Sequence, residues 1–115
     1  MQVTSSHVVT LTVSGKGLVS VNALSFAVPY DAKLFEYVGL DASAMKEMRN
    51  MTYDRLHSNG QKALYPTFVN CGEHPYLEGD GTLLTIQFRA KQKTRVDLIA
   101  KDGMIVDKYL NVITF

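Results

Sequence analysis

Apolar and polar residues alternate along most of this chain, and the clearest run covers residues 82–91. Successive side chains of a β-strand point to opposite faces, so this alternation is typical of strands that bury one face. Similar runs occupy residues 8–13 and 24–28. In the run that begins at residue 82, the side chains predicted to face the core are Leu84, Ile86, Phe88 and Ala90.

Glycine and proline residues divide these runs. Gly15-Lys-Gly17 is predicted to close the first strand in a tight turn, because glycine tolerates a positive φ. The apolar positions change parity around Asn22-Ala23, which predicts a β-bulge there. Pro29 has no N–H to donate and is expected to end the strand pairing. For the same reason, Pro66 predicts an edge position or a bulge in its own strand.

Turn signals predict hairpins in the second half of the chain. Ser58-Asn59-Gly60 separates strands expected over residues 51–57 and 61–69, and Asn-Gly favours the type I′ turn that matches strand twist. Asp102-Gly103 and Asp107-Lys108 are interpreted as turns between the C-terminal strands. Those strands are predicted over residues 96–100, 104–106 and 110–115.

The remaining segments predict one further strand and very little helix. Residues 34–40 are apolar on both faces apart from Glu36, which is typical of a strand that is central in its sheet or covered on both sides. Residues 41–48 are the only helical candidate, of two turns at most, and a loop with a helical turn is an equally good interpretation. Residues 70–81 are expected to form the longest irregular stretch.

About nine short strands, hairpin turns and at most one short helix predict an all-β fold, an antiparallel β-sandwich. A closed barrel is the alternative, and no feature of the pattern requires a parallel sheet. Residues 1–115 are expected to form a single domain. A domain of this length buries roughly two thirds of its unfolded surface, so it needs no metal or disulfide to fold. Its polar start suggests a module that belongs to a longer chain.

Composition excludes several classes of function. The formal net charge of +1 provides no broad field for nucleic acid, and the longest apolar runs are too short to span a membrane. Cys71 is the only cysteine, so no internal disulfide forms, and an unpaired thiol is most often a small buried side chain. The first residues lack the apolar segment of a signal peptide.

The candidate chemical groups do not form a recognisable catalytic or metal-binding motif. His74 and Glu78, with Glu73 and Asp80 nearby, lack the set spacing of a zinc site, so a solvated polar loop is the preferred interpretation. Four carboxylates could supply a glycosidase pair, but a small sandwich has little room for the cleft between them. These carboxylates are Asp31, Glu36, Asp41 and Asp54. We therefore predict no catalytic residues, no metal and no cofactor.

Exposed aromatic side chains would be needed for sugar binding, because their faces stack on pyranose rings. The chain has no tryptophan, and its most plausible exposed tyrosines are Tyr53, Tyr65 and Tyr76. A strand tyrosine at the edge of the core, with its hydroxyl in water, is the competing interpretation.

Two stretches in a fixed order carry a resemblance to a known family. Phe26-Ala-Val-Pro-Tyr30-Asp31, followed by Phe35-Glu36-Tyr37-Val38, resembles the apolar strand, Tyr-Asp-Pro turn and Leu-Glu-x-Val strand of cohesins. The later segment Gly79-Asp-Gly81 to Lys91 resembles the Gly-x-Leu-x-x-Ile-x-Phe-Lys-Ala strand of that family. The chain differs at Ala32, where the family usually has proline, and in its long loop over residues 70–81.

The resemblance implies a nine-stranded, jelly-roll-like sandwich without catalysis of its own. Such modules occur in secreted, multimodular carbohydrate-active proteins of bacteria, where one flat sheet face receives a helical, calcium-loaded dockerin. Carried over to this chain, the partner-binding residues would be Glu36, Val38, Leu83, Thr85, Gln87 and Arg89. A solvated sheet face packed against a neighbouring domain of the same chain is the alternative for these residues.

The sequence thus predicts a non-catalytic interaction or spacer module attached to a secreted glycoside hydrolase. Its partner would be a dockerin-like module or a neighbouring domain, at a secreted, periplasmic or cell-surface location. A carbohydrate-binding module that recognises glycans through its tyrosines is the alternative function.

Overall fold

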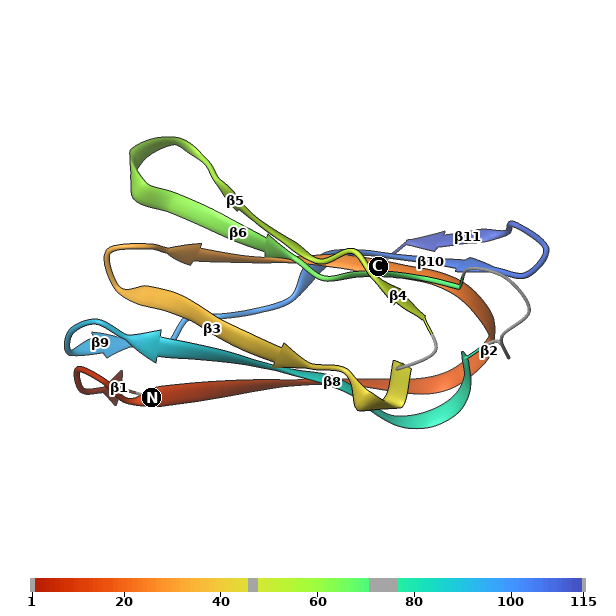
Figure 1. Ribbon diagram of the computed structural model, residues 1–115, viewed down its shortest axis with the longest axis horizontal. Coiled ribbons are helices and arrows are strands. Elements are labelled where there is room, and N and C mark those ends of the chain that lie inside the picture. Colours follow the sequence, from red (N-terminus) through yellow and green to blue (C-terminus); the bar gives the residue numbers. More distant parts are fainter. Residues whose placement is uncertain (1, 46–47, 71–76, 115) are drawn as a thin grey trace.

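Strand β2 (Val8–Asp31) passes through both layers of the fold and connects them. The computed structural model describes residues 2–45, 48–70 and 77–114. All strands except β1 and β9 join one hydrogen-bonded ladder of nine strands, in which every pairing is antiparallel. This ladder folds over on itself where β2 curves from the lower to the upper group of strands (Figure 1). The prediction of an antiparallel β-sandwich is confirmed.

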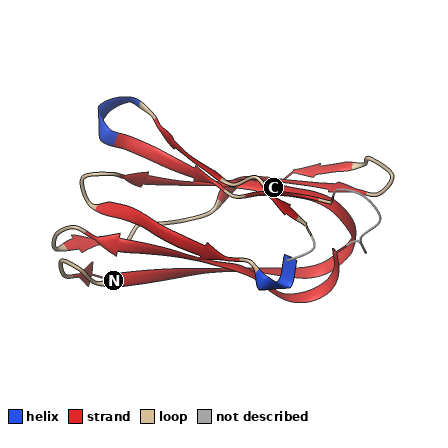
Figure 2. Ribbon diagram, viewed as in Figure 1, coloured by secondary structure: helices blue, strands red, loops and turns tan. Residues whose placement is uncertain are grey.

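The two layers use opposite halves of β2. In the first layer, β8 (Leu77–Ala90) lies between the N-terminal half of β2 and β3 (Phe35–Asp41). In the second layer, the C-terminal half of β2 pairs with β6 and β7 on one side and with β10 on the other. Two short 3-10 turns, Ser43–Met45 and Ser58–Gly60, are the only helical segments of the described chain (Figure 2). The other strands are β1 (Gln2–Val3), β4 (Arg49–Asn50), β5 (Tyr53–Leu56), β6 (Gln61–Tyr65), β7 (Thr67–Val69), β9 (Thr94–Arg95), β10 (Lys101–Asp107) and β11 (Val112–Thr114).

Strand β2 bends at Gly15-Lys-Gly17, where a turn that ends the strand was predicted. The strand continues through this segment, and the register with β8 shifts between Val13 and Ser14 and again on either side of Leu18. Gly17 takes a positive φ of 64° inside the strand, which glycine adopts without steric cost. The predicted bulge at Asn22 is confirmed, because Ala23 pairs with Val106 and Val21 pairs with the next residue, Asp107.

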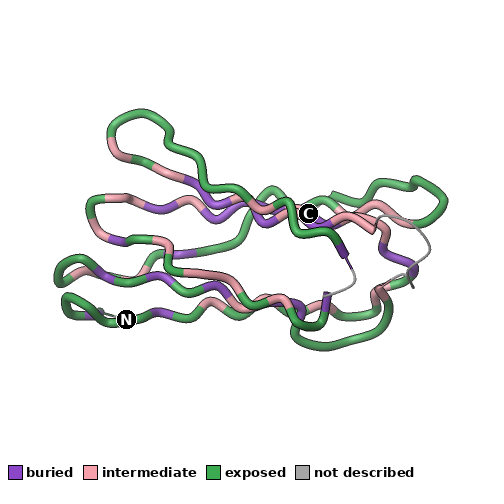
Figure 3. The backbone as a smooth tube through the Cα atoms, viewed as in Figure 1, coloured by how far each residue is buried: buried purple, intermediate pink, exposed green. Residues whose placement is uncertain are grey.

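The core lies between the layers and is formed by the residues whose parity predicted it. Leu84, Ile86, Phe88 and Ala90 are buried on the inner side of β8, and buried stretches alternate with exposed ones along the chain (Figure 3). The Tyr30 ring packs edge-on against Phe88, with 4.9 Å between the ring centroids. Opposite β8, the second layer contributes Leu24, Phe26, Val28, Leu64 and Phe68.

Both proline predictions need correction. Strand β2 continues past Pro29 to Asp31 and pairs there with β6 alone, so only one edge of the strand needs donors at this position. The strand that contains Pro66 is interrupted there into β6 and β7. It is not an edge strand, because β4 and β5 pair with it on the side opposite β2.

The predicted hairpins are partly confirmed. Asn59 and Gly60 both have positive φ, and the Gln61 N–H donates to the Ser58 carbonyl, as the type I′ turn requires. The Asp107 carboxylate accepts hydrogen bonds from the backbone N–H groups of Tyr109 and Asn111, which confirms the turn between β10 and β11. Hydrogen bonds from Asn111 lower the pKa of this carboxyl group.

Four other predictions about the strands and the segments between them are wrong. Strand β3 pairs only with β8, so it is an edge strand with one exposed face rather than a central one. Residues 96–100 form no strand, and Asp102-Gly103 is a register shift inside β10 rather than a turn. Residues 77–81 belong to β8, where Gly79 and Gly81 follow the bend of β2.

Four residues considered in the sequence analysis lie outside the described residues. They are Cys71, Glu73, His74 and Tyr76.

Leu83 faces the interior, contrary to the expectation that it lies on the outer face of its strand. The register skips this residue, because Val13 pairs with Leu84 and Ser14 pairs with Thr82. A β-bulge turns the extra side chain to the same side as its neighbour. Leu83 is only 7% exposed and lines an apolar cavity of about 350 Å³ between the layers.

We expect Leu83→Ala to destabilise the domain by about 2 kcal/mol or more, because it removes buried methyl groups beside an existing cavity. Gln87→Ala, on the exposed face of the same strand, should change the free energy of unfolding by less than about 0.5 kcal/mol. Urea denaturation of both variants tests the placement. Equal, small effects would contradict the buried position of Leu83.

Candidate interaction surface

The two outer faces of the sandwich differ in chemical character. The polar face covers the first layer, and its exposed or half-buried side chains come from three strands. They are Val8, Thr10, Thr12, Glu36, Val38, Thr85, Gln87 and Arg89. The structure thus brings together five of the six partner-binding residues predicted from the sequence, and Leu83 is the one it removes.

The polar face carries few apolar anchors and one ion pair. Arg89 Nη1 lies 3.1 Å from Glu36 Oε1, with both side chains about half exposed. Pairs of this kind contribute little net energy in water. Val8 and Val38 are the only large apolar side chains exposed on this face of the described strands.

The aromatic face covers the second layer and is built of cross-strand rows. Residues that pair across a sheet point to the same side, so the register of the strands defines these rows. One row is Arg49–Val69–Ala23–Val106–Val112. The next is Thr67–Ser25–Met104–Thr114, extended by Met51, whose N–H donates to the Thr67 carbonyl. All of these side chains lie opposite the buried Leu24, Phe26 and Phe68.

Tyr53 and Tyr65 lie on the aromatic face where strands β5 and β6 pair. They pair across these strands, and their rings stack with centroids 4.9 Å apart and an interplanar angle of 21°. A hydrogen bond of 2.9 Å joins the Tyr65 hydroxyl to His57 Nε2. Of the three tyrosines predicted to bind sugar, the structure therefore brings two together, and the third, Tyr76, is outside the described residues.

A hollow of about 300 Å³ lies beside the stacked rings. Ser25, Ala27 and Thr67 contribute to its floor and walls, and Asp102 of β10 lies on the side opposite the tyrosines. The register shift in β10 places Asp102 outside the regular pairing, where its φ is 54°. The hollow is therefore shaped by the register shift at Asp102-Gly103, a segment that was predicted to be a turn.

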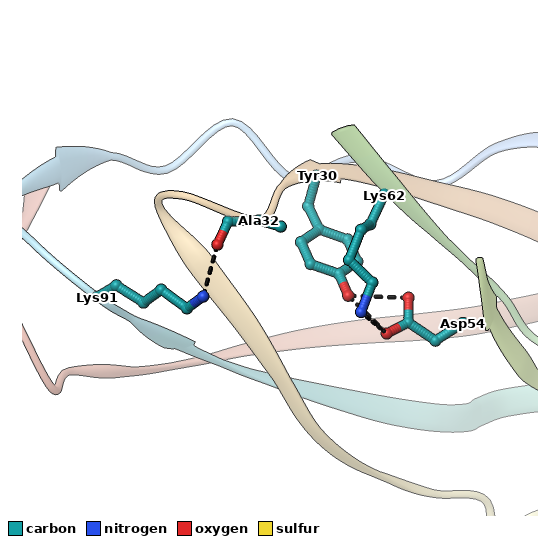
Figure 4. A network of polar contacts seen from close by, with 5 residues as sticks. All are labelled: Tyr30, Ala32, Asp54, Lys62 and Lys91. Atoms are coloured by element: carbon teal, nitrogen blue, oxygen red, sulfur yellow. Dashed lines mark hydrogen bonds and ion pairs between the residues drawn. The ribbon is translucent and has the colours of Figure 1, made fainter. Parts of the chain in front are cut away.

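A polar network holds strand β5, the outer strand beside β6, in place (Figure 4). The buried Tyr30 hydroxyl donates to the Asp54 carboxylate, at 2.8 Å from Oδ1 and 2.7 Å from Oδ2. Lys62 Nζ lies 2.7 Å from Asp54 Oδ2. Burial, and then the hydrogen bond to Asp54, raises the pKa of Tyr30, so this phenol remains a donor. Burial also raises the pKa of Tyr37.

The four carboxylates considered for catalysis are occupied by separate local contacts. Asp54 belongs to the network just described, and Glu36 pairs with Arg89. Asp31 accepts the Lys33 N–H, and Asp41 accepts the Ser43 N–H. These contacts stabilise turns and strands, and none of them joins one of the four carboxylates to another.

Two acidic residues of the predicted loop over residues 70–81 act as structural acceptors. Glu78 accepts a hydrogen bond from the Ser20 hydroxyl, and Asp80 accepts one from the Gly17 N–H. Both contacts fasten β8 to the bend of β2. Among the described residues, no group of three metal-binding side chains comes together.

A family model for the cohesin domain matches residues 4–113, which is nearly the whole chain. The chain belongs to the cohesin domain family. This confirms the resemblance found in the sequence. Cohesin domains are non-catalytic interaction modules, so membership supports an interaction role rather than an enzymatic one.

Solved cohesin structures share the fold of this chain. The sixth cohesin of Acetivibrio cellulolyticus scaffoldin B, solved with a Cel5 dockerin, is 20% identical with a TM-score of 0.70, over 95% of this chain and 82% of that one. A cohesin in a dockerin complex from Clostridium thermocellum is 11% identical with a TM-score of 0.68, over 96% and 79%. A non-cellulosomal cohesin from Archaeoglobus fulgidus is 15% identical with a TM-score of 0.64, over 96% and 75%.

No curated protein matches the sequence. Within the described chain, no helix has the length and apolar character needed to cross a membrane.

Sequence reasoning did not single out the aromatic face as a whole. It identified Tyr53 and Tyr65 but not Met51, Met104 or Val112, which lie on the same outer surface. The shared parity of Met51 and Tyr53 was an available signal. The contribution of β10 was not, because it depends on long-range pairing with β2.

We expect Asp54→Ala to destabilise the cohesin domain by about 1–3 kcal/mol, because it leaves the buried Tyr30 hydroxyl without its acceptor. Tyr30→Phe removes the donor but leaves Asp54 paired with Lys62, so its cost should be smaller, about 1 kcal/mol. Urea denaturation of both variants and of the double variant measures the coupling. Additive effects would show that the hydroxyl–carboxylate contact contributes nothing.

Proposed function

We propose that this cohesin domain is a non-catalytic recognition module that binds a dockerin-type protein through its aromatic face. The proposal rests on the exposed apolar side chains that are concentrated on the aromatic face. Met51, Tyr53, Met104 and Val112 are 53%, 52%, 40% and 59% exposed. Surfaces of this kind mark interaction sites, because covering them releases water from apolar side chains and lowers the free energy of the system.

The composition of the aromatic face suits a protein interface. Tyrosine and methionine are enriched in interface centres, and a tyrosine gives a large contact area with few rotatable bonds. The rings of Tyr53 and Tyr65 are already stacked, and the Tyr30–Asp54–Lys62 network holds the strand that carries Tyr53. A partner therefore meets a largely pre-formed surface, which lowers the entropic cost of binding.

The polar face predicted from the sequence is the second candidate surface for the same function. Glu36, Val38, Thr85, Gln87 and Arg89 do lie together there. With Val8 and Val38 as its main apolar side chains, it offers fewer anchors than the aromatic face. Packing against a neighbouring domain of the same chain suits this more polar surface.

We also propose a wider role, which the family and its structural relatives support. Two of the similar cohesins were solved as complexes with dockerins, one of them a Cel5 dockerin held by a scaffoldin cohesin. In line with these relatives, we place the module in a longer, secreted or cell-surface protein that acts in polysaccharide degradation, attached to a glycoside hydrolase.

Glycan binding through the tyrosines is the alternative function. Tyr53 is exposed, and Ser25 and Asp102 offer polar groups to a sugar beside it. Stacking occupies one face of each ring, however, so each of these tyrosines has at most one face left for a pyranose. The protein-binding function makes fuller use of this surface.

The test is biolayer interferometry of the immobilised domain against a panel of calcium-loaded dockerins, with and without EDTA, alongside a glycan array. We expect calcium-dependent binding that Tyr53→Ala weakens about tenfold or more. The matched variant on the polar face, Arg89→Glu, should change affinity by about twofold or less.

Each other outcome has a definite meaning. Loss of binding with Arg89→Glu but not with Tyr53→Ala would transfer the site to the polar face. Saturable glycan binding that Tyr53→Ala abolishes, without any dockerin bound, would establish the alternative function. Binding of neither class would overturn the proposed recognition role.

A further inference from the structure

Cationic side chains surround the apolar centre of the aromatic face. Arg55 pairs across the sheet with Ala63, and Arg49 pairs with Val69, so these arginines lie at the two ends of the β4–β5 edge. On the other side of β2, Lys101 pairs with Ala27, which lines the hollow, and Lys101 also borders the apolar cavity between the layers. All three side chains are exposed, and Asp102 is the only carboxylate among the described residues that form this surface.

None of these three cations forms an ion pair with another described residue. The ion pairs of the described chain are Lys62–Asp54, which faces the inner side of the second layer, and Arg89–Glu36 on the polar face. The charges of Arg49, Arg55 and Lys101 are therefore not neutralised within the described domain. Their field extends over the apolar residues between them.

The polar face has the opposite balance. Glu36 and Asp41 on β3 carry negative charge, and Arg89, the cation beside them, is already paired with Glu36. The formal net charge of +1 for the whole chain thus conceals an asymmetry between its two outer faces. Only the face with the exposed apolar anchors has a surplus of positive charge.

We infer that the partner of this domain is a protein whose contact surface presents apolar side chains flanked by carboxylates. This inference rests on the proposed function and specifies the chemistry of the partner at the same site. An apolar patch on the partner would cover Tyr53 and Met104, while its carboxylates would meet Arg49, Arg55 and Lys101. Charge complementarity of this kind selects partners, because like charges placed opposite one another repel and disfavour the wrong partner.

A nucleic acid fits this surface less well, although it is also anionic. Proteins that bind the phosphate backbone tightly use about six to ten phosphate contacts. The aromatic face offers three cations around an apolar centre, which a phosphate backbone would leave uncovered. The combination of cations with exposed methionine and tyrosine points to a protein.

The cations around the apolar centre should affect the rate at which the partner associates. Charges at the rim of an interface act mainly on the rate of association and on its salt dependence, whereas buried anchors act mainly on dissociation. Arg49→Glu and Arg55→Glu should each lower the association rate about threefold to tenfold at low salt. At about 0.5 M salt these differences should fall below about twofold, because the Debye length is then only a few ångströms.

The experiment measures binding kinetics against the same panel of calcium-loaded dockerins, whose net charges are known from their sequences. It compares wild type, Arg49→Glu, Arg55→Glu, the double variant and Arg89→Glu, at about 0.05 M and about 0.5 M salt. Arg89→Glu makes the same charge change on the polar face. Thermal melting of each variant controls for folding, and a double-stranded DNA oligonucleotide serves as the anionic control.

The inference is supported if acidic dockerins bind best and if the two aromatic-face variants, but not Arg89→Glu, slow their association at low salt. It is overturned if dockerins bind with rates independent of these charges, an outcome that leaves the proposed function intact. Failure of every dockerin to bind overturns both. Tight binding of the DNA that Arg55→Glu abolishes would instead assign the surface to nucleic acid.

Discussion

Backbone pairing along both halves of strand β2 is the constraint on which the rest of this structure depends. The N-terminal half pairs with β8, and the C-terminal half pairs with β6, β7 and β10, so one strand fixes the position of both layers. The bend between the halves requires register shifts and the positive φ of Gly17. Because side chains alternate along a strand, this single path also determines which residues face the core and which face outward.

The same constraint leads from packing to recognition. Inward-facing Leu24, Phe26 and Val28 anchor β2 in the core, so the alternating Ser25 and Ala27 lie on the outer face between β6 and β10. Strand β5 depends most on side-chain contacts for its position, because it lies at the edge of the second layer beyond β6. Tyr30 reaches it from the interior through Asp54, and Tyr53 of the same strand is presented on the outer side.

Much of the fold could be predicted from the sequence, because alternation is a local property. The inner residues of β8, the Asn22 bulge and the Asn59-Gly60 turn were all predicted from local pattern and turn chemistry. Glycine was ambiguous at Gly15-Lys-Gly17, because a turn and a bend inside a strand can both use the positive φ that Gly17 adopts. Asp102-Gly103 was also interpreted as a turn, but it is a register shift inside β10 in which Asp102 has the positive φ. Leu83 was misplaced because a bulge depends on the partner strand rather than on its own sequence.

The candidate site was harder to predict, because it is assembled from segments far apart in the chain. Tyr53 and Met104 share a face only because β2 pairs with β6 on one side and with β10 on the other. Family resemblance gave the kind of function but did not distinguish one outer face from the other. Exposure of apolar side chains and the distribution of charge distinguish them, and both become visible only when the register is known.

Hydroxyl-radical footprinting of the domain, free and bound to a dockerin, tests most directly whether the aromatic face is the binding surface. Methionine and tyrosine react readily with these radicals, and Met51, Tyr53 and Met104 are exposed on this face, while Tyr109 provides an exposed reference at the β10–β11 turn. If the aromatic face is the binding surface, binding should lower the oxidation of the first three residues and leave that of Tyr109 unchanged. Unchanged oxidation of Met51, Tyr53 and Met104 in a saturated complex would contradict it.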